Sequence, residues 1–454
     1  MTATRRTTAT RRTEAARRTT AARRPAAPAG VAGVLAPVAE QFLGGELPVR
    51  LRAWDGSEAG PARGSVLVLR SKQALRRLLW HPGELGLAQA YVTGELDVEG
   101  DLTDALRAVW QTARQRSCPA EPAEPAAPAR PPTRASAGAW AAAAATAVRL
   151  GVPGPRPAAP AAEARLTGRR HSRSRDQAVI AHHYDVPPAF YELILDPRMA
   201  YSCALWTSPD ATLAGAQLAK LDAICRKLEL SPGQRLLDIG CGWGSLAIHA
   251  ARAYGVRVTA VTLAGEQAAY VRRRAASLDR PELVTVVSQD YRDIGAGTYD
   301  AVASVEMGEH VGDREYPAFC GLIRDRLKPR GHMLIQQMSR GASAPGGGAF
   351  IEAYIAPDMH MRPLGQTVSL LEDAGLEVVA VQGMRADYTR TIRAWLDRLE
   401  QRQPEVTAML GPEAARVWRL YLAGAALAFE EGRMGVDQIL AVRPGGPAEP
   451  GRPR

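Results

Sequence analysis

The second half of the chain alternates short apolar runs with helical segments, and few folds can accommodate this pattern. Seven runs predict β-strands, and helical spacing fills the intervals between the early ones. Such alternation predicts an open, mainly parallel sheet covered by helices on both faces. Ligands of such sheets bind beyond the carboxyl ends of the strands, so functional residues are expected directly after each strand. The predicted strands are Arg235–Ile239, Arg257–Val261, Leu283–Ser288, Ala301–Val305, Met333–Gln337, Glu377–Val381 and Ile439–Val442.

Composition divides the rest of the chain into segments of different character. Residues 1–30 repeat Arg-Arg pairs in a Thr and Ala background with nothing to form a core, which predicts a disordered tail. Residues 31–117 combine strand-like alternation with helical spacing and predict a small α+β domain. Residues 118–175 are rich in Pro and Ala, a composition typical of a linker. The catalytic α/β domain is therefore expected over 176–445, with a short tail at 446–454.

Charge and cysteine usage suggest where such a protein works. The formal net charge is +10, and the first 30 residues hold eight arginines against one glutamate. Such charge favours contact with anionic surfaces without choosing between phospholipid and nucleic acid. The five cysteines show neither C-x-x-C pairs nor zinc-ligand spacing, which favours reduced thiols in the cytoplasm and predicts no metal site. No apolar run is long enough to span a membrane and we find no cleavable signal, so any membrane contact is expected to be peripheral.

A glycine-rich motif, Asp238-Ile-Gly240-Cys-Gly242-Trp-Gly244, follows the first predicted strand and precedes a helix. Glycines let the backbone approach a ligand, and the helix N-terminus offers free N–H groups. Dinucleotide sites use a related pattern, but Ser245 stands where that pattern needs its third glycine. The next strand also ends without the acid that binds a nicotinamide ribose. The motif resembles the first motif of class I S-adenosylmethionine-dependent methyltransferases, which implies that cofactor.

The fold alone does not choose the methyl acceptor. Enzymes that methylate base amino groups usually carry Asn/Asp-Pro-Pro-Tyr after the fourth strand, whereas this chain has Ser304–Gly312 there. We therefore expect no nucleic-acid partner, despite the arginine-rich tail.

Seven ordered segments together resemble the cyclopropane fatty acid synthase family, which includes the mycolic acid cyclopropane synthases. The resemblance covers 178–442, and Gly83–Leu102 is similar to the N-terminal lipid-associated domain of the bacterial phospholipid-acting members. The segments are His183–Asp185 with Leu195–Pro197 and Tyr201–Ala204, Gly240–Gly244, Thr262–Leu263 with Gln267, Asp290–Asp293, Glu306–Gly312, Asp387–Thr391 with Trp395, and Gly432–Gln438.

This resemblance implies a class I methyltransferase fold: a Rossmann-like, seven-stranded, mainly parallel sheet with an antiparallel last strand, beside a small N-terminal α+β domain. It implies a cyclopropane-fatty-acyl-phospholipid synthase, which adds a methylene from S-adenosylmethionine across the cis double bond of an unsaturated phospholipid acyl chain. The partner would be a phospholipid at the inner face of the membrane, and we consider a homodimer as the assembly. The cofactor contacts implied by the family are Tyr184, Tyr201, Ser202, Asp238, Gly240, Gly242, Gly244, Thr262, Leu263, Gln267, Asp290 and Tyr291.

The chemistry requires an acceptor for a proton. Attack of an alkene on the sulfonium methyl leaves a carbocation, which needs a dry site with aromatic faces and a positioned base. The resemblance implies that this base is a bound bicarbonate ion, held by Cys203, Glu309 and Tyr388 and by the backbone of Met338. Phe190, Leu193 and Ile194 have helical spacing, which fits an acyl entrance or core packing equally well.

One residue departs from the family pattern: Gln336 stands where members often have histidine. Its amide can donate a hydrogen bond to an anion but cannot shuttle a proton. This leaves open a second product, a 10-methylene or 10-methyl branched chain formed from the same kind of cation. A methyltransferase acting on another lipid or small molecule, a catalytically inactive lipid-binding protein and a nucleic-acid-modifying enzyme also remain open as functions.

Overall fold

The computed structural model describes residues 30–115, 136–184, 186–341 and 346–445, and the side chains of 180–184 are not part of this description. The arginine-rich tail, the first part of the expected linker and the C-terminal tail thus lie outside the described residues, except at their edges. None of the helices in these four ranges is long and apolar enough to cross a lipid bilayer.

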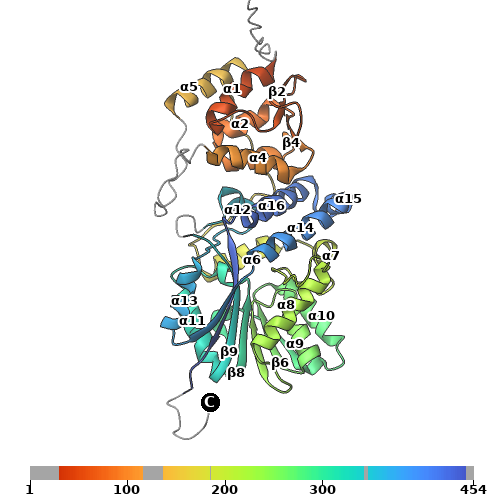
Figure 1. Ribbon diagram of the computed structural model, residues 1–454, viewed down its shortest axis with the longest axis vertical. Coiled ribbons are helices and arrows are strands. Elements are labelled where there is room, and N and C mark those ends of the chain that lie inside the picture. The colour runs from red at the N-terminus through yellow and green to blue at the C-terminus, as the bar shows by residue number, and fades with distance from the viewer. Residues whose placement is uncertain (1–29, 116–135, 185, 342–345, 446–454) are drawn as a thin grey trace, which may run out of the picture.

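The larger part of the molecule is built on a seven-stranded sheet in the order β10-β11-β9-β8-β5-β6-β7 (Figure 1). Pairing is parallel from β9 through β8 and β5 to β6 and β7, whereas β11 is antiparallel to both of its neighbours. This arrangement confirms the predicted fold class, including the antiparallel last strand. The strands are β5 Arg235–Ile239, β6 Arg257–Thr262, β7 Val284–Ser288, β8 Tyr299–Val305, β9 Leu327–Ser339, β10 Glu377–Gly383 and β11 Gly435–Val442.

Helices cover both faces of this sheet and bury two apolar cores. On one face, α8 (Leu213–Lys227) and α9 (Ser245–Tyr254) pack on the apolar side chains of β5, β6 and β8, with residues of α10 (Gly265–Ala276) at the margin. On the other face, α11 (Tyr316–Arg326) and α13 (Leu364–Asp373) bury a second cluster. Both cores exclude water from the sheet, so the strand ends are held rigidly as a platform for loops.

A layer of helices lies beyond the carboxyl ends of the strands, between the sheet and the N-terminal part of the chain (Figure 1). It includes α7 (Pro188–Ile194), α12 (Ala349–Tyr354), α14 (Arg385–Gln401), α15 (Gln403–Leu410) and α16 (Pro412–Glu430). Phe190 and Ile194 of α7 are completely buried in the core of this layer. That burial fits the core-packing interpretation of these two residues.

The N-terminal part is a four-stranded sheet in the order β2-β1-β3-β4 with helices packed on it. It contacts α16 through polar contacts as well as apolar ones: Arg416 donates to the carbonyl of Leu96 over 2.9 Å, and Arg107 pairs with Glu430. Its apolar core also continues into the helical layer. Its elements are α1 Val31–Leu43, β1 Arg50–Arg52, β2 Glu58–Ala59, β3 Val66–Leu69, α2 Lys72–Trp80, α3 Glu84–Val92, β4 Leu96–Glu99 and α4 Leu102–Gln115.

The segment expected to be an unstructured linker contains helical structure in its described part. The alanine run forms α5 (Ala137–Arg149), consistent with the high helix propensity of alanine. Trp140 anchors this helix to α1 through an edge-to-face contact with Phe42, with ring centroids 5.0 Å apart. A single aromatic residue thus gives a uniform helix a specific packing partner. The α6 helix follows at Arg173–Tyr184.

Candidate active site

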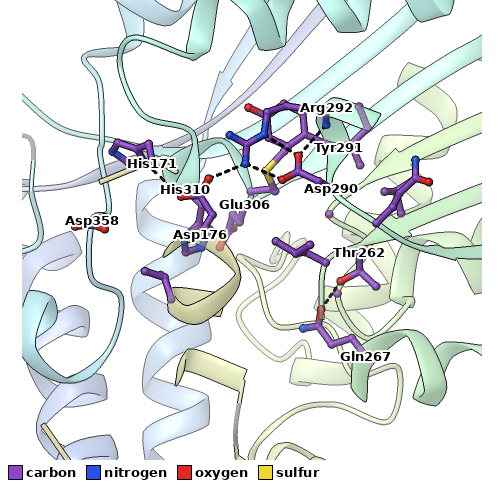
Figure 2. Close-up of a pocket in the computed structure, with 18 of the residues that line it drawn as sticks. His171, Asp176, Thr262, Gln267, Asp290, Tyr291, Arg292, Glu306, His310 and Asp358 are labelled. Atoms are coloured by element: carbon purple, nitrogen blue, oxygen red, sulfur yellow. Dashed lines mark hydrogen bonds and ion pairs between the residues drawn. The ribbon is translucent and has the colours of Figure 1, made fainter. Parts of the chain in front are cut away.

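Two adjoining pockets open at the carboxyl ends of the parallel strands, where such sheets bind their ligands. The larger contains about 860 Å³ of empty space, including its open mouth, and Figure 2 shows the side chains around it. Both pockets share four lining residues, Gly240, Gly242, Gln267 and Glu306. The glycine-rich loop therefore lies at the junction of the two.

The glycines of this loop have different roles. Gly242 has φ +52° and lines both pockets, and a Cβ there would meet no protein atom within 4 Å. Gly244 has φ +80° and caps α9, and its Cβ would lie 2.8 Å from Val271 of α10. It lines neither pocket, so the expected cofactor contact at Gly244 is replaced by a close helix contact. Gly242 alone of this pair faces the ligand space.

We expect Gly242→Ala to weaken S-adenosylmethionine binding by about tenfold or more, because the new methyl group would enter the pocket. The left-handed backbone should also cost about 1–2 kcal/mol of stability. Gly255→Ala is the matched control, since Gly255 has φ +65° at the far end of α9 and its Cβ would make an ordinary contact at 3.4 Å. Calorimetric titration and thermal melts should show equal stability losses but a binding loss only at Gly242; equal binding in both variants would contradict this role.

Unsatisfied polar atoms beside the loop fit the charged amino-acid end of S-adenosylmethionine. Thr262 donates a hydrogen bond to Gln267 over 2.8 Å, which leaves the Gln267 amide nitrogen buried and without a partner among the described residues. One carboxylate oxygen of Asp238 is also buried and without a partner among the described residues. Burial raises the pKa of this carboxyl group to about 7. Buried polar groups are rarely left unpaired. These atoms are therefore suited to bind a polar ligand.

The opposite end of the larger pocket carries an ion-pair network (Figure 2). Arg292 bonds Asp290 over 2.7 Å and Asp176 of α6 over 2.7 Å, and His171 lies 3.9 Å from Asp176. The Arg292 guanidinium outweighs burial and holds the pKa of Asp290 below its ordinary value, so this carboxylate stays ionised. Tyr291 and Leu263, two of the expected cofactor contacts, also line this pocket.

The smaller pocket brings two more expected cofactor contacts together with a buried lysine. Tyr201 and Ser202 line it, and Lys220 donates a hydrogen bond to the Ser202 hydroxyl over 2.8 Å. Lys220 is only 1% exposed, and burial lowers the pKa of its ammonium group. No motif in the sequence singles out Lys220. The side chain of Tyr184, another expected contact, lies outside the described residues.

Glu306, which follows β8 directly, is the centre of the site. One carboxylate oxygen accepts hydrogen bonds from the backbone N–H of Cys203 and the amide of Gln336, each over 2.8 Å. The second oxygen accepts from the Tyr388 hydroxyl over 2.5 Å. Three catalytic candidates from the sequence thus converge on a carboxylate for which the sequence predicts no catalytic role. Burial raises the pKa of Glu306, although these three donors oppose the shift.

The backbone of Glu306 is also unusual, because φ is +53° in a residue other than glycine. Side chains larger than glycine rarely adopt this conformation, which costs on the order of 1–3 kcal/mol and tends to occur at functional sites. Its own N–H is fixed by the carbonyl of Gln336 over 2.6 Å. The fold therefore holds this carboxylate in place against local strain.

Glu309, the acid expected to help bind bicarbonate, has a different environment. It is 1% exposed, one oxygen accepts from the backbone N–H of Met338 over 2.6 Å, and the second has no partner among the described residues. Burial and then the charge of Glu306 raise its pKa to about 8. Glu309 is therefore mostly protonated near neutral pH. Its side chain lines neither pocket.

The thiol of Cys203 takes no part in these contacts. It donates to the carbonyls of Ala204 and Met384, and burial raises its pKa well above the ordinary value. Cys203 serves the site through its backbone: its N–H donates to Glu306, and its carbonyl accepts from the Gln336 amide over 3.2 Å. Burial and the charge of Glu306 likewise raise the pKa of Tyr388, so its hydroxyl remains a proton donor in the hydrogen bond.

A chain of side-chain amides fixes the orientation of Gln336. Lys227 donates to the Gln438 oxygen over 2.5 Å, and Gln438 donates to the Gln336 oxygen over 2.8 Å. Gln336 and Gln438 are direct cross-strand partners on β9 and β11. Because its oxygen is occupied, Gln336 must present its NH₂ group to Glu306. Gln336, the residue that departs from the family pattern, is thus held as a hydrogen-bond donor to Glu306.

Aromatic side chains surround this site on the side of the helical layer. Tyr388 packs on Phe429 with ring centroids 4.6 Å apart and on Trp395 at 6.1 Å. Tyr201 contacts Trp395 and Trp418 at 5.3 and 6.2 Å. Such faces stabilise positive charge and exclude water. The site can therefore combine a carboxylate, a cofactor pocket and an environment suited to a cation.

Comparison with known proteins agrees with this geometry. Residues 171–439 match the sequence model of the family described as mycolic acid cyclopropane synthetase. A probable fatty acid methyltransferase from Pseudomonas putida is 35% identical over 88% of this chain and 92% of its own length. The cyclopropane-fatty-acyl-phospholipid synthase of Escherichia coli (strain K12) is 34% identical over 62% of this chain and 72% of its own length.

Among solved structures, the mycolic acid cyclopropane synthase CmaA1 in complex with SAH (S-adenosylhomocysteine) and CTAB is similar with a TM-score of 0.56 and 29% identity. It covers 59% of this chain and 98% of the CmaA1 chain. SAH is the demethylated form of the cofactor that the glycine loop and its unpaired polar atoms fit. The chain belongs to the mycolic acid cyclopropane synthetase family of S-adenosylmethionine-dependent, lipid-modifying methyltransferases.

Proposed function

We propose that this protein is a cyclopropane-fatty-acyl-phospholipid synthase, which adds a methylene across the cis double bond of an unsaturated phospholipid acyl chain. The observation that carries the proposal is a triply hydrogen-bonded carboxylate, Glu306, which lines both cofactor pockets beside an aromatic cluster. Methylation of oxygen or nitrogen needs no such combination, because those acceptors are nucleophiles in their own right. An alkene acceptor needs both protection of a cation and removal of a carbon-bound proton.

The residues divide this work between them. When bound, S-adenosylmethionine supplies an electrophilic methyl group to the alkene, which leaves a carbocation on the acyl chain. Asp238 and Gln267 hold the amino-acid end of the cofactor. The ring of Tyr201, which lines the smaller pocket, faces the cation, and Trp395 and Tyr388 form the aromatic cluster behind it that keeps water away.

A methylene-branched chain is the second candidate product. Both products lose a proton from the new methyl carbon; in ring closure the C–H electron pair bonds to the cationic carbon, whereas the branch requires a prior hydride shift. The relative from P. putida, named a probable fatty acid methyltransferase, spans more of this chain than the E. coli phospholipid synthase does. Because of this difference in coverage, both products are tested below.

We further propose that the substrate is reached at a membrane surface. Leu79 and Trp80 at the end of α2 and Leu87 in α3 are 40%, 49% and 42% exposed, and the two helices are joined by a short turn. Exposed Arg156 contacts His81 of that turn, and exposed Lys72 is the first residue of α2. Apolar side chains flanked by cations suit the interface of an anionic bilayer.

Fatty acids recovered after incubation with S-adenosylmethionine and vesicles of monounsaturated phospholipid should gain one CH₂. Gas chromatography with mass spectrometry distinguishes the two products, and the ring should dominate. A methylene branch of the same mass would establish the second candidate instead. Bound cofactor with no modified lipid from any unsaturated vesicle would refute the acyl-chain acceptor.

A further inference from the structure

The family resemblance implied that a bound bicarbonate takes the proton, but the residues present do not fit that ion. Among the groups expected to hold it, every hydrogen-bond donor already has a partner in the chain, and only the second oxygen of Glu309 is without one among the described residues. Cys203 N–H, Tyr388 and Gln336 bond Glu306, and the backbone N–H of Met338 bonds Glu309. A carboxylate presents the same two-oxygen face as bicarbonate, so the side chain already satisfies the anion site.

We infer that Glu306 is the catalytic base, a carboxylate built into the chain in place of a bound bicarbonate, so that turnover requires no added bicarbonate. This inference rests on the proposed function. In the step, a C–H bond of the new methyl group breaks, its electron pair forms the carbon–carbon bond that closes the ring, and the proton passes to a Glu306 oxygen. Glu306 then returns the proton to water before the next turnover.

Three features of the structure support this role. Glu306 lines both pockets and so borders the place where cofactor and acceptor must meet, whereas Glu309 lines neither. Glu306 has a left-handed backbone at φ +53°, a conformation that is uncommon outside glycine and tends to occur at functional sites. The hydrogen bonds that run from Lys227 through Gln438 end at the NH₂ group of Gln336. This group donates to the carboxylate and does not carry a proton.

Glutamine at position 336 is consistent with this replacement. A bicarbonate ion can exchange with solvent and carry its proton away, whereas a fixed side chain must be held in position and release its proton to water. The amide of Gln336 orients Glu306 and cannot take up a proton itself. The amide of Gln336 and the carboxylate of Glu306 therefore complement each other at one site.

The test removes the carboxylate and offers the ion instead. Glu306→Gly suits the left-handed backbone and leaves a space lined by the same donors. Wild-type protein should turn over equally in CO₂-free buffer and with added sodium bicarbonate, at ionic strength matched with sodium chloride. Glu306→Gly should lose about 10²–10⁴-fold in kcat and recover at least about tenfold with bicarbonate or formate.

Binding provides a readout that needs no lipid product. Calorimetric titration with bicarbonate should detect binding to Glu306→Gly, saturating in the millimolar range, and none to the wild type. If wild-type turnover depended on bicarbonate, or if wild type bound the ion, the inference would be overturned. Full activity of Glu306→Gly without any anion, or its failure to bind or respond to either ion while still binding cofactor, would also overturn it. Absence of lipid product with this binding pattern intact would count against the proposed substrate alone.

Discussion

Glu306→Gln should lower kcat by about 10²–10⁴-fold, the usual contribution of a positioned base, while S-adenosylmethionine binds within a few-fold of its wild-type affinity. The amide is nearly isosteric, and its oxygen can still accept from the Cys203 N–H and Gln336. It cannot take up the proton that ring closure releases. Steady-state turnover on unsaturated vesicles and calorimetric titration of the cofactor separate the two effects.

Glu309→Gln is the matched comparison for this prediction. Because the pKa of Glu309 is raised to about 8, an amide closely imitates its neutral form near pH 7 and preserves the bond from Met338. We expect this variant to lose less than about tenfold in kcat, since no ionised group is removed. Equal and large losses in both variants would show that the charge of Glu309 matters and that Glu306 is not the sole base.

The fold is predictable from the sequence because it depends on local patterns. The strand predicted at Arg235–Ile239 has the predicted bounds, since apolar periodicity and flanking turn residues define it. The uniform alanine run of α5 indicates no specific packing, yet Trp140 gives this helix a partner in α1. That contact joins residues far apart in sequence, which periodicity does not register.

The sequence predicts several residues of the candidate site, but it does not predict that Glu306 lies at the centre of the site. The resemblance selects Cys203, Tyr388 and Gln336, yet it implies no catalytic role for Glu306, on which all three converge. The position of Glu306 directly after a strand is the signal that the sequence contains. Gln438 lies within a matching segment, but its role depends on the register that places it opposite Gln336, and a register is set by three-dimensional pairing.

Burial separates residues that the sequence alone treats alike. The resemblance gives a catalytic role to Glu309 and none to Glu306, whereas burial makes Glu309 mostly neutral and three donors hold Glu306. Lys220 is not predictable as a site residue, because a lone lysine in a helix is usually exposed. Here it is 1% exposed and bonded to Ser202 beside the cofactor loop.

Tyr388→Phe should lower kcat by about 10–100-fold on the acidic side of neutrality and shift the acid limb of the pH profile upward. The hydroxyl donates to Glu306 over 2.5 Å and so stabilises its ionised form. A hydrogen bond to a charged group contributes about 1.5–3 kcal/mol, which corresponds to about 1–2 pKa units. Loss of that bond raises the pKa of Glu306 further, so less of the base is ionised at a given pH.

The sign of the pH dependence follows from which form is active. A base works when ionised, so activity is present above its pKa and is lost as the pH falls through it. The acid limb of Tyr388→Phe should therefore lie about 1–2 pH units above that of the wild type, with the rates converging as pH rises. The rates must be measured below about pH 8, because ionised Glu309 would add a second negative charge near Glu306 and raise its pKa. The positive charge of buried Lys220 acts in the opposite direction and lowers the pKa of Glu306.

Tyr316→Phe is the control, because the Tyr316 hydroxyl is equally buried but donates to Gln337 rather than to Glu306. It should leave the acid limb in place even if the protein loses some stability. A constant ratio between Tyr388→Phe and wild-type rates across the profile would mean that Tyr388 positions the acyl chain and does not tune Glu306. A displaced limb with unchanged cofactor affinity would identify Glu306 as the titrating group, because Tyr388 itself remains protonated throughout this range.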